Sequence, residues 1–224
     1  MSKINTVAVT GATGLIGSAL VGQLKSDGYE VKKLVRRPIR NSEEVFWNPT
    51  LGEINLDALA ETDAIIHLAG AGVGDKRWSA AYKSEILNSR LLGTTTIAKA
   101  ANELGVKRFI SASAIGYYGE TGNRAVTVHD QIRAINFLLN SKIAGAVNLT
   151  APNPVTNQEF TAALARAMHR PAIFPAPAFA LRLALGGFST EILGSKKVLP
   201  KALLDAGFEF DYPHVSSALT ALVD

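Results

Sequence analysis

The 224-residue chain contains no cysteine. It can therefore form neither a disulfide framework nor a thiolate metal site, and it is compatible with a reducing cytoplasm. Its four histidines are dispersed, without the H-x-x-x-H or H-x-E spacing typical of a zinc site. These histidines are His67, His129, His169 and His214. We therefore predict no bound metal.

Long apolar runs and the features of a secretory signal are also missing. The amino terminus reads MSKINTVAV, without a basic region followed by an apolar stretch and a small-residue cleavage site. The most apolar later stretch, PAIFPAPAFALRLALGGF, is interrupted by Pro175, Pro177 and Arg182. It is also shorter than the roughly 20 residues that span a bilayer. These absences predict a cytoplasmic protein that is not inserted in a membrane.

Positive charge is in excess but is not concentrated. The formal net charge is +4, and the basic residues occur in scattered pairs such as Lys32–Lys33 and Lys196–Lys197. No basic helix face interleaved with aromatic residues emerges, as a nucleic-acid-binding surface would require. We predict no nucleic-acid partner, and a monomer or a homodimer that acts on a small molecule.

Segments typical of strands alternate with segments typical of helices. Residues 5–10 are a short β-branched run, apolar residues at helical spacing follow from Leu15 to Leu24, and Glu30–Val35 is again typical of a strand. Further patterns indicate a hairpin over 45–56 and strands within 63–72, 106–114 and 145–152. The alternation predicts an α/β fold with a doubly wound parallel sheet of the Rossmann type.

The character of the sequence changes near residue 155. Thr156 and Glu159 form a T-x-x-E capping box, which predicts the start of a helix. Short helices punctuated by proline are predicted after it. We expect a dinucleotide-binding domain over 1–155 and a small, mainly helical C-terminal region on the substrate side over 156–224.

A glycine-rich turn, TGATGLIG, lies between the first predicted strand and the first predicted helix. Gly11, Gly14 and Gly17 allow a tight turn, close approach of the backbone to a pyrophosphate, and packing of the helix on the strand. The start of the helix, with Thr13, Leu15 and Ile16, then presents free N–H groups to the phosphates. The alternative is a glycine-rich turn without a ligand. The strand–turn–helix context favours a dinucleotide.

The residues after the second predicted strand bear on which dinucleotide binds. Glu30 is acidic, as an NAD-specific site would require, but it begins that strand and so lies at the wrong end. Arg36 and Arg37 follow the strand, and a guanidinium matches a phosphate. NADP is favoured over NAD on this basis, and the alternative is that the arginines are merely solvated.

A second turn of small residues follows the strand within 63–72. HLAGAG places Leu68, Ala69 and Gly70 directly after that strand. Their small size would let the ribose of a cofactor approach the backbone. The alternative is a plain transition from a strand to a turn.

Several motifs together resemble the short-chain dehydrogenase/reductase superfamily, in its extended and atypical branch. They are TGATGLIG, LVRRP, HLAGAG, DKRW followed by SEILNSRLLGTTTI, and FISASAIGYYG. More closely, the chain resembles the NAD(P)-dependent sugar-nucleotide epimerase family that carries a small C-terminal domain of unknown function (DUF1731). The tail FALRLALGGFSTEILGSKKVLPKALLDAGFEFDYP is similar to that domain. The resemblance covers nearly all of the chain and implies a Rossmann fold, an NAD(P) cofactor and oxidoreductase or isomerase chemistry.

The resemblance also implies candidate catalytic residues. The superfamily uses a serine that orients a substrate oxygen, a tyrosine that passes a proton, and a lysine four residues later. Ser113 matches the serine position, and Tyr117 in the same motif lies near the expected pocket. The proton-donating tyrosine of the family belongs on a later helix that has no counterpart here. The only Y-x-x-x-K, Tyr29 to Lys33, lies in a predicted strand and is interpreted as chance.

An internal block is missing near residues 123–129. Only NRAVTVH stands between Gly122 and Asp130. Members of the resembled family place a long helix, a further strand and substrate-binding loops there. Catalysis is therefore the part of the resemblance that this sequence supports least.

Two functions follow from these observations. The first is an NADP-binding protein, similar to epimerases and reductases, that transfers a hydride to or from a carbonyl or carbinol carbon of a small or nucleotide-linked substrate. The alternative is a non-catalytic NADP(H)-binding regulatory protein, which the absent tyrosine–lysine helix favours.

Overall fold

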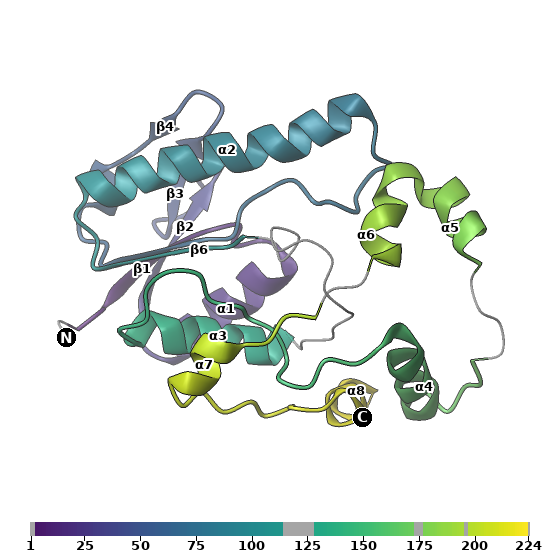
Figure 1. The fold of residues 1–224 in the computed structure, drawn as a ribbon. Coiled ribbons are helices and arrows are strands. Elements are labelled where there is room, and N and C mark those ends of the chain that lie inside the picture. The colour runs from purple at the N-terminus through teal and green to yellow at the C-terminus, as the bar shows by residue number, and fades with distance from the viewer. Residues whose placement is uncertain (1–2, 114–127, 173–176, 195–196, 224) are drawn as a thin grey trace. The chain divides into compact units, whose positions relative to one another are not determined.

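The structure is a computed structural model, and it forms two compact units, Met1–Ser113 and Ala114–Asp224 (Figure 1). It describes residues 3–113, 128–172, 177–194 and 197–223.

The first unit is built on a six-stranded sheet with the order β4-β3-β2-β1-β5-β6. Its strands are β1 (Thr6–Thr10), β2 (Glu30–Val35), β3 (Glu44–Asn48), β4 (Glu53–Ile54), β5 (Ala64–His67) and β6 (Arg108–Ser111). All neighbouring strands run parallel except β3 and β4, which form an antiparallel hairpin. The predicted parallel sheet of the Rossmann type is confirmed, and so is the hairpin.

Two helices cover opposite faces of this sheet, α1 (Leu15–Ser26) on one and α2 (Ala80–Glu103) on the other (Figure 1). Because side chains alternate along a strand, each strand supplies both faces. Ala8, Leu34 and Ile65 pack in one cluster with Ile97 of α2. Their neighbours Val7 and Val9 point to the opposite face and are also fully buried. Burial on both faces explains why the central strands are continuous apolar runs.

The regular elements among the described residues of the second unit are helices. They are α3 (Val128–Asn140), α4 (Asn157–Ala167), α5 (Ala178–Leu185), α6 (Ser189–Leu193), α7 (Lys201–Asp205) and α8 (Val215–Val223). The predicted capping box is present, because the Thr156 hydroxyl accepts from the Glu159 N–H while the Glu159 carboxylate accepts from the Thr156 N–H. The mainly helical C-terminal region is confirmed, and the boundary at residue 155 stays a prediction.

The segment after α7 is tied to α3 by ring and ionic contacts. Phe208 lies edge-on to Phe137, with 5.4 Å between the ring centroids. Arg133 donates to the Glu209 carbonyl (2.9 Å) and forms an ion pair with Asp211 (2.8 Å). These contacts join α3 to the segment after α7, about 75 residues later in the sequence.

The strand predicted over 145–152 is wrong. The structure assigns no strand to these residues. Thr150 instead donates through its hydroxyl to the Val198 carbonyl (3.1 Å), and Asn148 donates through its amide to the Leu199 carbonyl (3.2 Å). Side chains rather than a ladder of backbone hydrogen bonds therefore hold this segment. An apolar run becomes a strand only where a neighbouring strand accepts and donates along its length.

Candidate functional site

The candidate site lies at the point of the sheet where the strand order reverses, between β1 and β5. From β1 the chain continues to β2 and β3 on one side, and it returns to β5 and β6 on the other. Thr10 and His67, the last residues of β1 and β5, are direct neighbours in the parallel register. In open α/β sheets, ligands bind outside the carboxyl ends of the strands at such a switch point. The turns that follow these two strands therefore form the site.

In the glycine turn after β1, two of the three glycines stand where a side chain would clash with backbone atoms. Gly11 has a φ of +69°, and a Cβ there would lie 2.9 Å from the backbone N of Ala69. A Cβ on Gly17 would lie 2.1 Å from the Gly11 carbonyl oxygen. The first glycine thus lets the turn touch the segment after β5, and the third lets α1 pack on the turn. Gly14 is less constrained, with 3.4 Å between its built Cβ and the Gly11 oxygen.

The start of α1 is open to an anion. Gly14 is the N-cap residue, so no side chain accepts a hydrogen bond from the first turn, and that turn carries no acidic residue. Thr13 and Leu15 are exposed and Ile16 is half-buried. The first N–H groups of a helix lack partners within the helix and carry partial positive charge. The turn therefore offers the donors that a pyrophosphate requires.

A buried hydrogen-bond network joins the two turns beneath the site. The Thr10 hydroxyl oxygen accepts from the N–H groups of Leu68 (3.1 Å) and Ala69 (3.2 Å) and lies 2.7 Å from His67 Nδ1. Because its two lone pairs are used, the hydroxyl donates to Nδ1, which makes His67 neutral with its proton on Nε2. Burial also lowers the pKa of His67. The network fixes the backbone of the second turn against β1.

Residues of α2 hold the rest of that second turn. The Ala71 N–H donates to the Ser89 hydroxyl (3.0 Å), Arg90 donates to the Ala71 carbonyl (3.1 Å), and Tyr82 donates to the Gly72 carbonyl. A Cβ on Gly70 would meet the Arg90 guanidinium at 3.5 Å. Sequence analysis placed Leu68, Ala69 and Gly70 in the site, but it did not identify these supporting contacts.

Arg36 and Arg37 follow β2 at the same edge of the sheet, in different environments. Arg37 forms a two-pronged ion pair with Glu44, with nitrogen–oxygen distances of 2.8 and 2.7 Å. The hydrogen bonds from Arg37 lower the pKa of Glu44 to about 2, and the pKa of Arg37 is raised in turn. Arg36 is exposed and has no hydrogen-bond or ion-pair partner among the described residues. Arg36 is thus the guanidinium left for a ligand.

The candidate catalytic residues follow β6. Ser111 pairs with His67 in the parallel register, and Ser113 lies two residues later, exposed, beyond the carboxyl end of the strand. Ser113 therefore follows the same edge of the sheet as Thr10 and His67. Tyr117 lies outside the described residues, as do residues 123–127 of the predicted missing block.

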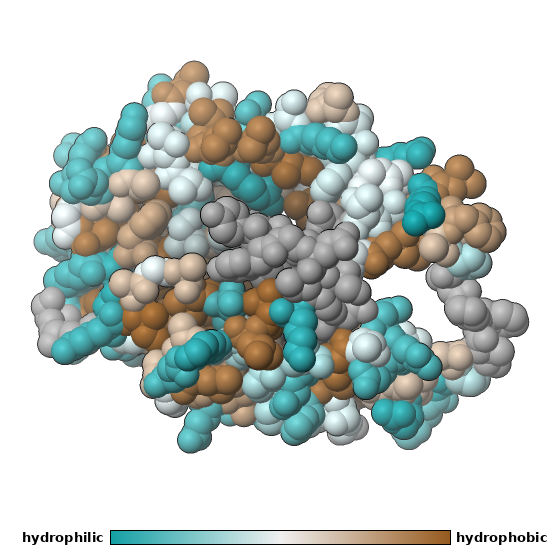
Figure 2. All heavy atoms as spheres, in the orientation of Figure 1, coloured by the Kyte–Doolittle hydropathy of each residue, from teal (hydrophilic) through white to brown (hydrophobic). Residues whose placement is uncertain are grey.

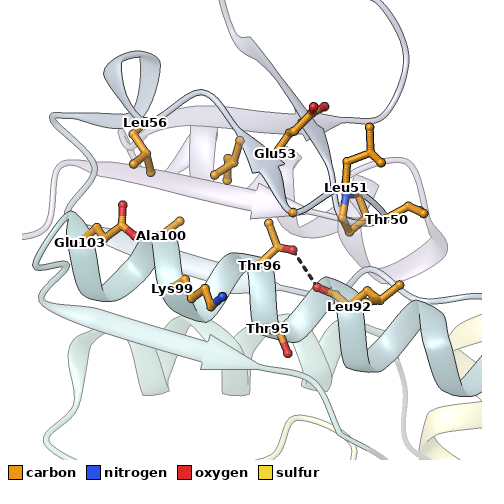
Figure 3. Close-up of a pocket in the computed structure, with 13 residues that line it drawn as sticks. Thr50, Leu51, Glu53, Leu56, Leu92, Thr95, Thr96, Lys99, Ala100 and Glu103 are labelled. Carbon is orange, nitrogen blue, oxygen red and sulfur yellow. Dashed lines mark hydrogen bonds between the residues drawn. The ribbon is translucent and has the colours of Figure 1, made fainter.

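A separate cavity of about 550 Å³ lies between the β3–β4 hairpin and α2 (Figure 3). Its walls include Leu51 and Glu53 of the hairpin and Leu92, Thr96 and Glu103 of α2. This cavity is distinct from the candidate site. The turn after β5 contacts the first half of α2, from Tyr82 to Arg90, whereas the cavity is lined by α2 residues from Leu92 onward. The Thr96 hydroxyl, directed toward the helix, donates to the Leu92 carbonyl (2.8 Å).

The described residues contain neither a metal site nor a membrane-spanning helix. Over residues 3–113, 128–172, 177–194 and 197–223, no three acidic or histidine side chains come together as a metal site would require. Within the same residues, no helix combines the length and hydropathy needed to cross a membrane. Figure 2 shows apolar residues at the surface over α2. Among the residues of α2, Leu87 and Leu91 are 57% and 56% exposed.

Comparison with known proteins extends over nearly the whole chain. The NAD dependent epimerase/dehydratase family matches residues 7–151, and the domain of unknown function DUF1731 matches residues 176–222. Epimerase family protein ML0860 of Mycobacterium leprae is 32% identical over 294 positions, covering 98% of this chain and 96% of that protein. Epimerase family protein SAOUHSC_00792 of Staphylococcus aureus is 29% identical and covers 96% and 98%.

The length of the first of these alignments bears on the missing block. It has 294 positions, whereas this chain has 224 residues, so at least 70 positions have no residue here. The relatives are therefore longer within the aligned region.

Solved structures of low sequence identity share the fold. The human epimerase family protein SDR39U1 (isoform 2), solved with NADPH, superposes with a TM-score of 0.86 at 21% identity, covering 97% of this chain and 99% of that one. UDP-glucose 4-epimerase of Thermus thermophilus, solved with NAD, has a TM-score of 0.70 at 18% identity and covers 98% of each chain. The arrangement of strands, glycine turn and helices, together with the match over residues 7–151, shows that this chain belongs to the NAD dependent epimerase/dehydratase family.

Proposed function

We propose that this protein binds NADP at the switch point of the sheet and transfers a hydride between the nicotinamide and a carbinol or carbonyl carbon of a small polar or nucleotide-linked molecule. The observation that carries the proposal is the uncapped start of α1 together with Arg36, which follows β2 at the same edge of the sheet and has no partner among the described residues. Together they supply backbone donors for a pyrophosphate and a guanidinium for a further phosphate.

The preference for NADP depends on Arg36. Among the structures that share the fold, the human protein was solved with NADPH and the Thermus enzyme with NAD, so the fold is compatible with either dinucleotide. A free guanidinium after β2 favours the dinucleotide that carries a 2′-phosphate, because the charge would otherwise meet only a hydroxyl. Arg37 contributes less in this proposal, since Glu44 already neutralises it.

The remaining residues of the site would hold the cofactor and the substrate. Gly11, Gly14 and Gly17 shape the turn that receives the pyrophosphate, with Thr13, Leu15 and Ile16 at its rim. Leu68, Ala69 and Gly70 form the wall for a ribose. When bound, the nicotinamide supplies the hydride chemistry. Ser113 would donate a hydrogen bond to the substrate oxygen, and Tyr117 would line the same pocket.

A second function is favoured by one specific observation. The chain lacks at least 70 positions of its aligned relatives. Its one Y-x-x-x-K spacing, Tyr29 to Lys33, begins directly before β2, so Tyr29 lies at the amino end of that strand and away from the carboxyl edge where the site is. A protein that binds NADP(H) and reports its state to a partner, without catalysis, needs only the glycine turn and Arg36.

One experiment separates the two. The full chain is titrated with NADPH while the fluorescence of the nicotinamide is followed, and is then offered a panel of aldehydes and ketones. Saturable binding followed by oxidation of NADPH supports the enzyme, whereas binding without oxidation supports the regulatory protein. Absence of binding to both NADPH and NADH would contradict both functions.

A further inference from the structure

The carboxylate of Glu44 accepts three hydrogen bonds from the segment that follows β2, next to the proposed phosphate site. Glu44 is the first residue of β3, and only 6% of its side chain is exposed. Its carboxylate accepts from both terminal nitrogens of Arg37 and from the backbone N–H of Arg40 (2.8 Å). Arg37 also donates to the Pro38 carbonyl (2.9 Å). A two-pronged pair fixes orientation as well as charge, so these contacts define the path of the chain after β2.

This clamp leaves one guanidinium directly after β2 available. Lys33 of β2 pairs with Glu44 in the parallel register, so the carboxylate lies one strand away from the segment that it holds. Arg37 is drawn back to that strand and is neutralised. Arg36, its neighbour in sequence, keeps an unpaired charge among the described residues. A loop held in its binding conformation loses less conformational entropy when a ligand arrives.

We propose that Glu44 is a positioning residue that sets the preference for a 2′-phosphate, by holding Arg37 and the backbone of Arg40 so that Arg36 is presented to the ligand. This inference rests on the proposed function, because it assigns selectivity within the same dinucleotide site. It concerns a residue that would touch neither cofactor nor substrate.

The test compares the affinities of NADPH and NADH for the full chain and for E44Q, R36A and the double variant. Glutamine keeps the size of Glu44 but removes the charge that orients Arg37. E44Q is expected to weaken NADPH by about threefold to tenfold and to leave NADH unchanged. In the R36A background E44Q is expected to change NADPH affinity little, because Glu44 is proposed to act only through the contact between Arg36 and the 2′-phosphate.

Glu43 provides a matched control. Its carboxylate pairs with Lys25 (2.6 Å) and Lys33 (2.9 Å), so E43Q removes one neighbouring negative charge without touching the clamp. E43Q is expected to keep the wild-type ratio of the two affinities. An equal effect of E43Q and E44Q would overturn the proposal, because the cause would then be net charge.

Other outcomes distinguish this inference from the proposed function. A wild-type chain that binds neither dinucleotide contradicts the proposed function itself. A preference for NADPH that R36A abolishes and E44Q retains overturns only the role of Glu44, and so does an equal loss of both affinities in E44Q. If E44Q does not fold, R37K replaces it, since lysine keeps the charge but cannot form the two-pronged pair. Unchanged selectivity in R37K would also overturn the proposal.

Discussion

At the scale of single residues, the candidate site depends on approaches between backbone atoms that leave no room for side chains. A Cβ on Gly17 would meet the Gly11 carbonyl oxygen, and a Cβ on Gly11 would meet the backbone of Leu68 and Ala69 in the turn after β5. The turn as folded therefore accepts no side chain at either position. The spacing of the three glycines predicted this, because it is the spacing that such a turn requires.

Replacing Gly17 with alanine is expected to destabilise the first unit. The new methyl group would lie 2.1 Å from the Gly11 oxygen, so the turn must move, at a cost of about 1–3 kcal/mol of unfolding free energy. Chemical denaturation measures this cost, and dinucleotide affinity is expected to fall with it. Gly22 lies in the same helix with open space around it, and Gly22→Ala is expected to stabilise by about 0.5–1 kcal/mol. Effects of the same sign would contradict the structure of the turn.

The phosphate preference is tested at Arg36. Arg36→Ala is expected to weaken NADPH by about 1–3 kcal/mol, which is typical of a lost charge-assisted hydrogen bond, and to leave NADH nearly unchanged. Titration by fluorescence gives both affinities. Arg170→Ala removes an exposed positive charge from the second unit and should change neither. Equal losses for the two dinucleotides in Arg36→Ala would show that the arginine does not contact the 2′-phosphate.

Other residues of the site could not have been predicted from local sequence. Thr10 and His67 are 57 residues apart, and Arg37 meets Glu44 only because β2 and β3 pair in one particular register. Such contacts depend on tertiary alignment, which a motif does not encode. That Arg36, and not Arg37, has no partner in the described part of the chain follows from the same alignment; the sequence alone does not distinguish the two adjacent arginines.

At the scale of elements, local sequence signals predicted the start of helix α4 correctly but predicted a strand over 145–152 that the structure does not contain. The capping box at Thr156 is a signal within four residues, and it acts as predicted. The run 145–152 has the composition of a strand but lacks a partner in the sheet. A helix satisfies its backbone groups internally, whereas a strand needs a neighbour that the sequence of the strand does not supply.

The capping box also gives a prediction for α4. Thr156→Ala removes the acceptor of the Glu159 N–H and is expected to cost about 0.5–2 kcal/mol of unfolding free energy. Thermal unfolding followed by circular dichroism measures it. Thr161→Ala, at an exposed position within the same helix, changes the same residue type without a cap and should have little effect or slightly stabilise. A cost for Thr161→Ala as large as that for Thr156→Ala would argue against the cap.

At the scale of the whole molecule, the epimerase/dehydratase family matches residues 7–151 and DUF1731 matches residues 176–222, although at least 70 aligned positions are absent. The absent positions leave the switch point of the sheet complete, because Thr10, His67 and the glycine turn all come from the first unit. We therefore expect the proposed dinucleotide binding to be measurable whether or not the chain has turnover. For this reason a binding assay and a turnover assay are both required.

The acid stability of the fold reports on two buried or hydrogen-bonded groups. Asp63 pairs with Lys107 (2.5 Å) and accepts from the N–H groups of Asn5 (2.7 Å) and Thr6 (3.1 Å), which joins the starts of β1, β5 and β6. The hydrogen bond from Lys107 is the main cause that lowers its pKa to about 2. A carboxyl that binds its proton more weakly when folded stabilises the fold above its ordinary pKa, and this contribution is lost as pH falls toward 2. Neutral His67 acts in the same direction at higher pH, because burial lowers its pKa and unfolding lets it take up a proton below about pH 6.5.

We therefore expect the free energy of unfolding to fall in two steps between about pH 7 and about pH 3. Urea denaturation at intervals across this range measures both steps. Asp63→Asn should lower stability near neutral pH and reduce the step below about pH 4, to which Glu43 and Glu44 also contribute because their ion pairs lower the pKa of each to about 2, while leaving the step below about pH 6.5 in place. Asp57→Asn, at an exposed position in the same unit, should keep both steps. A stability that does not change over this range would contradict the assigned roles of Asp63 and His67.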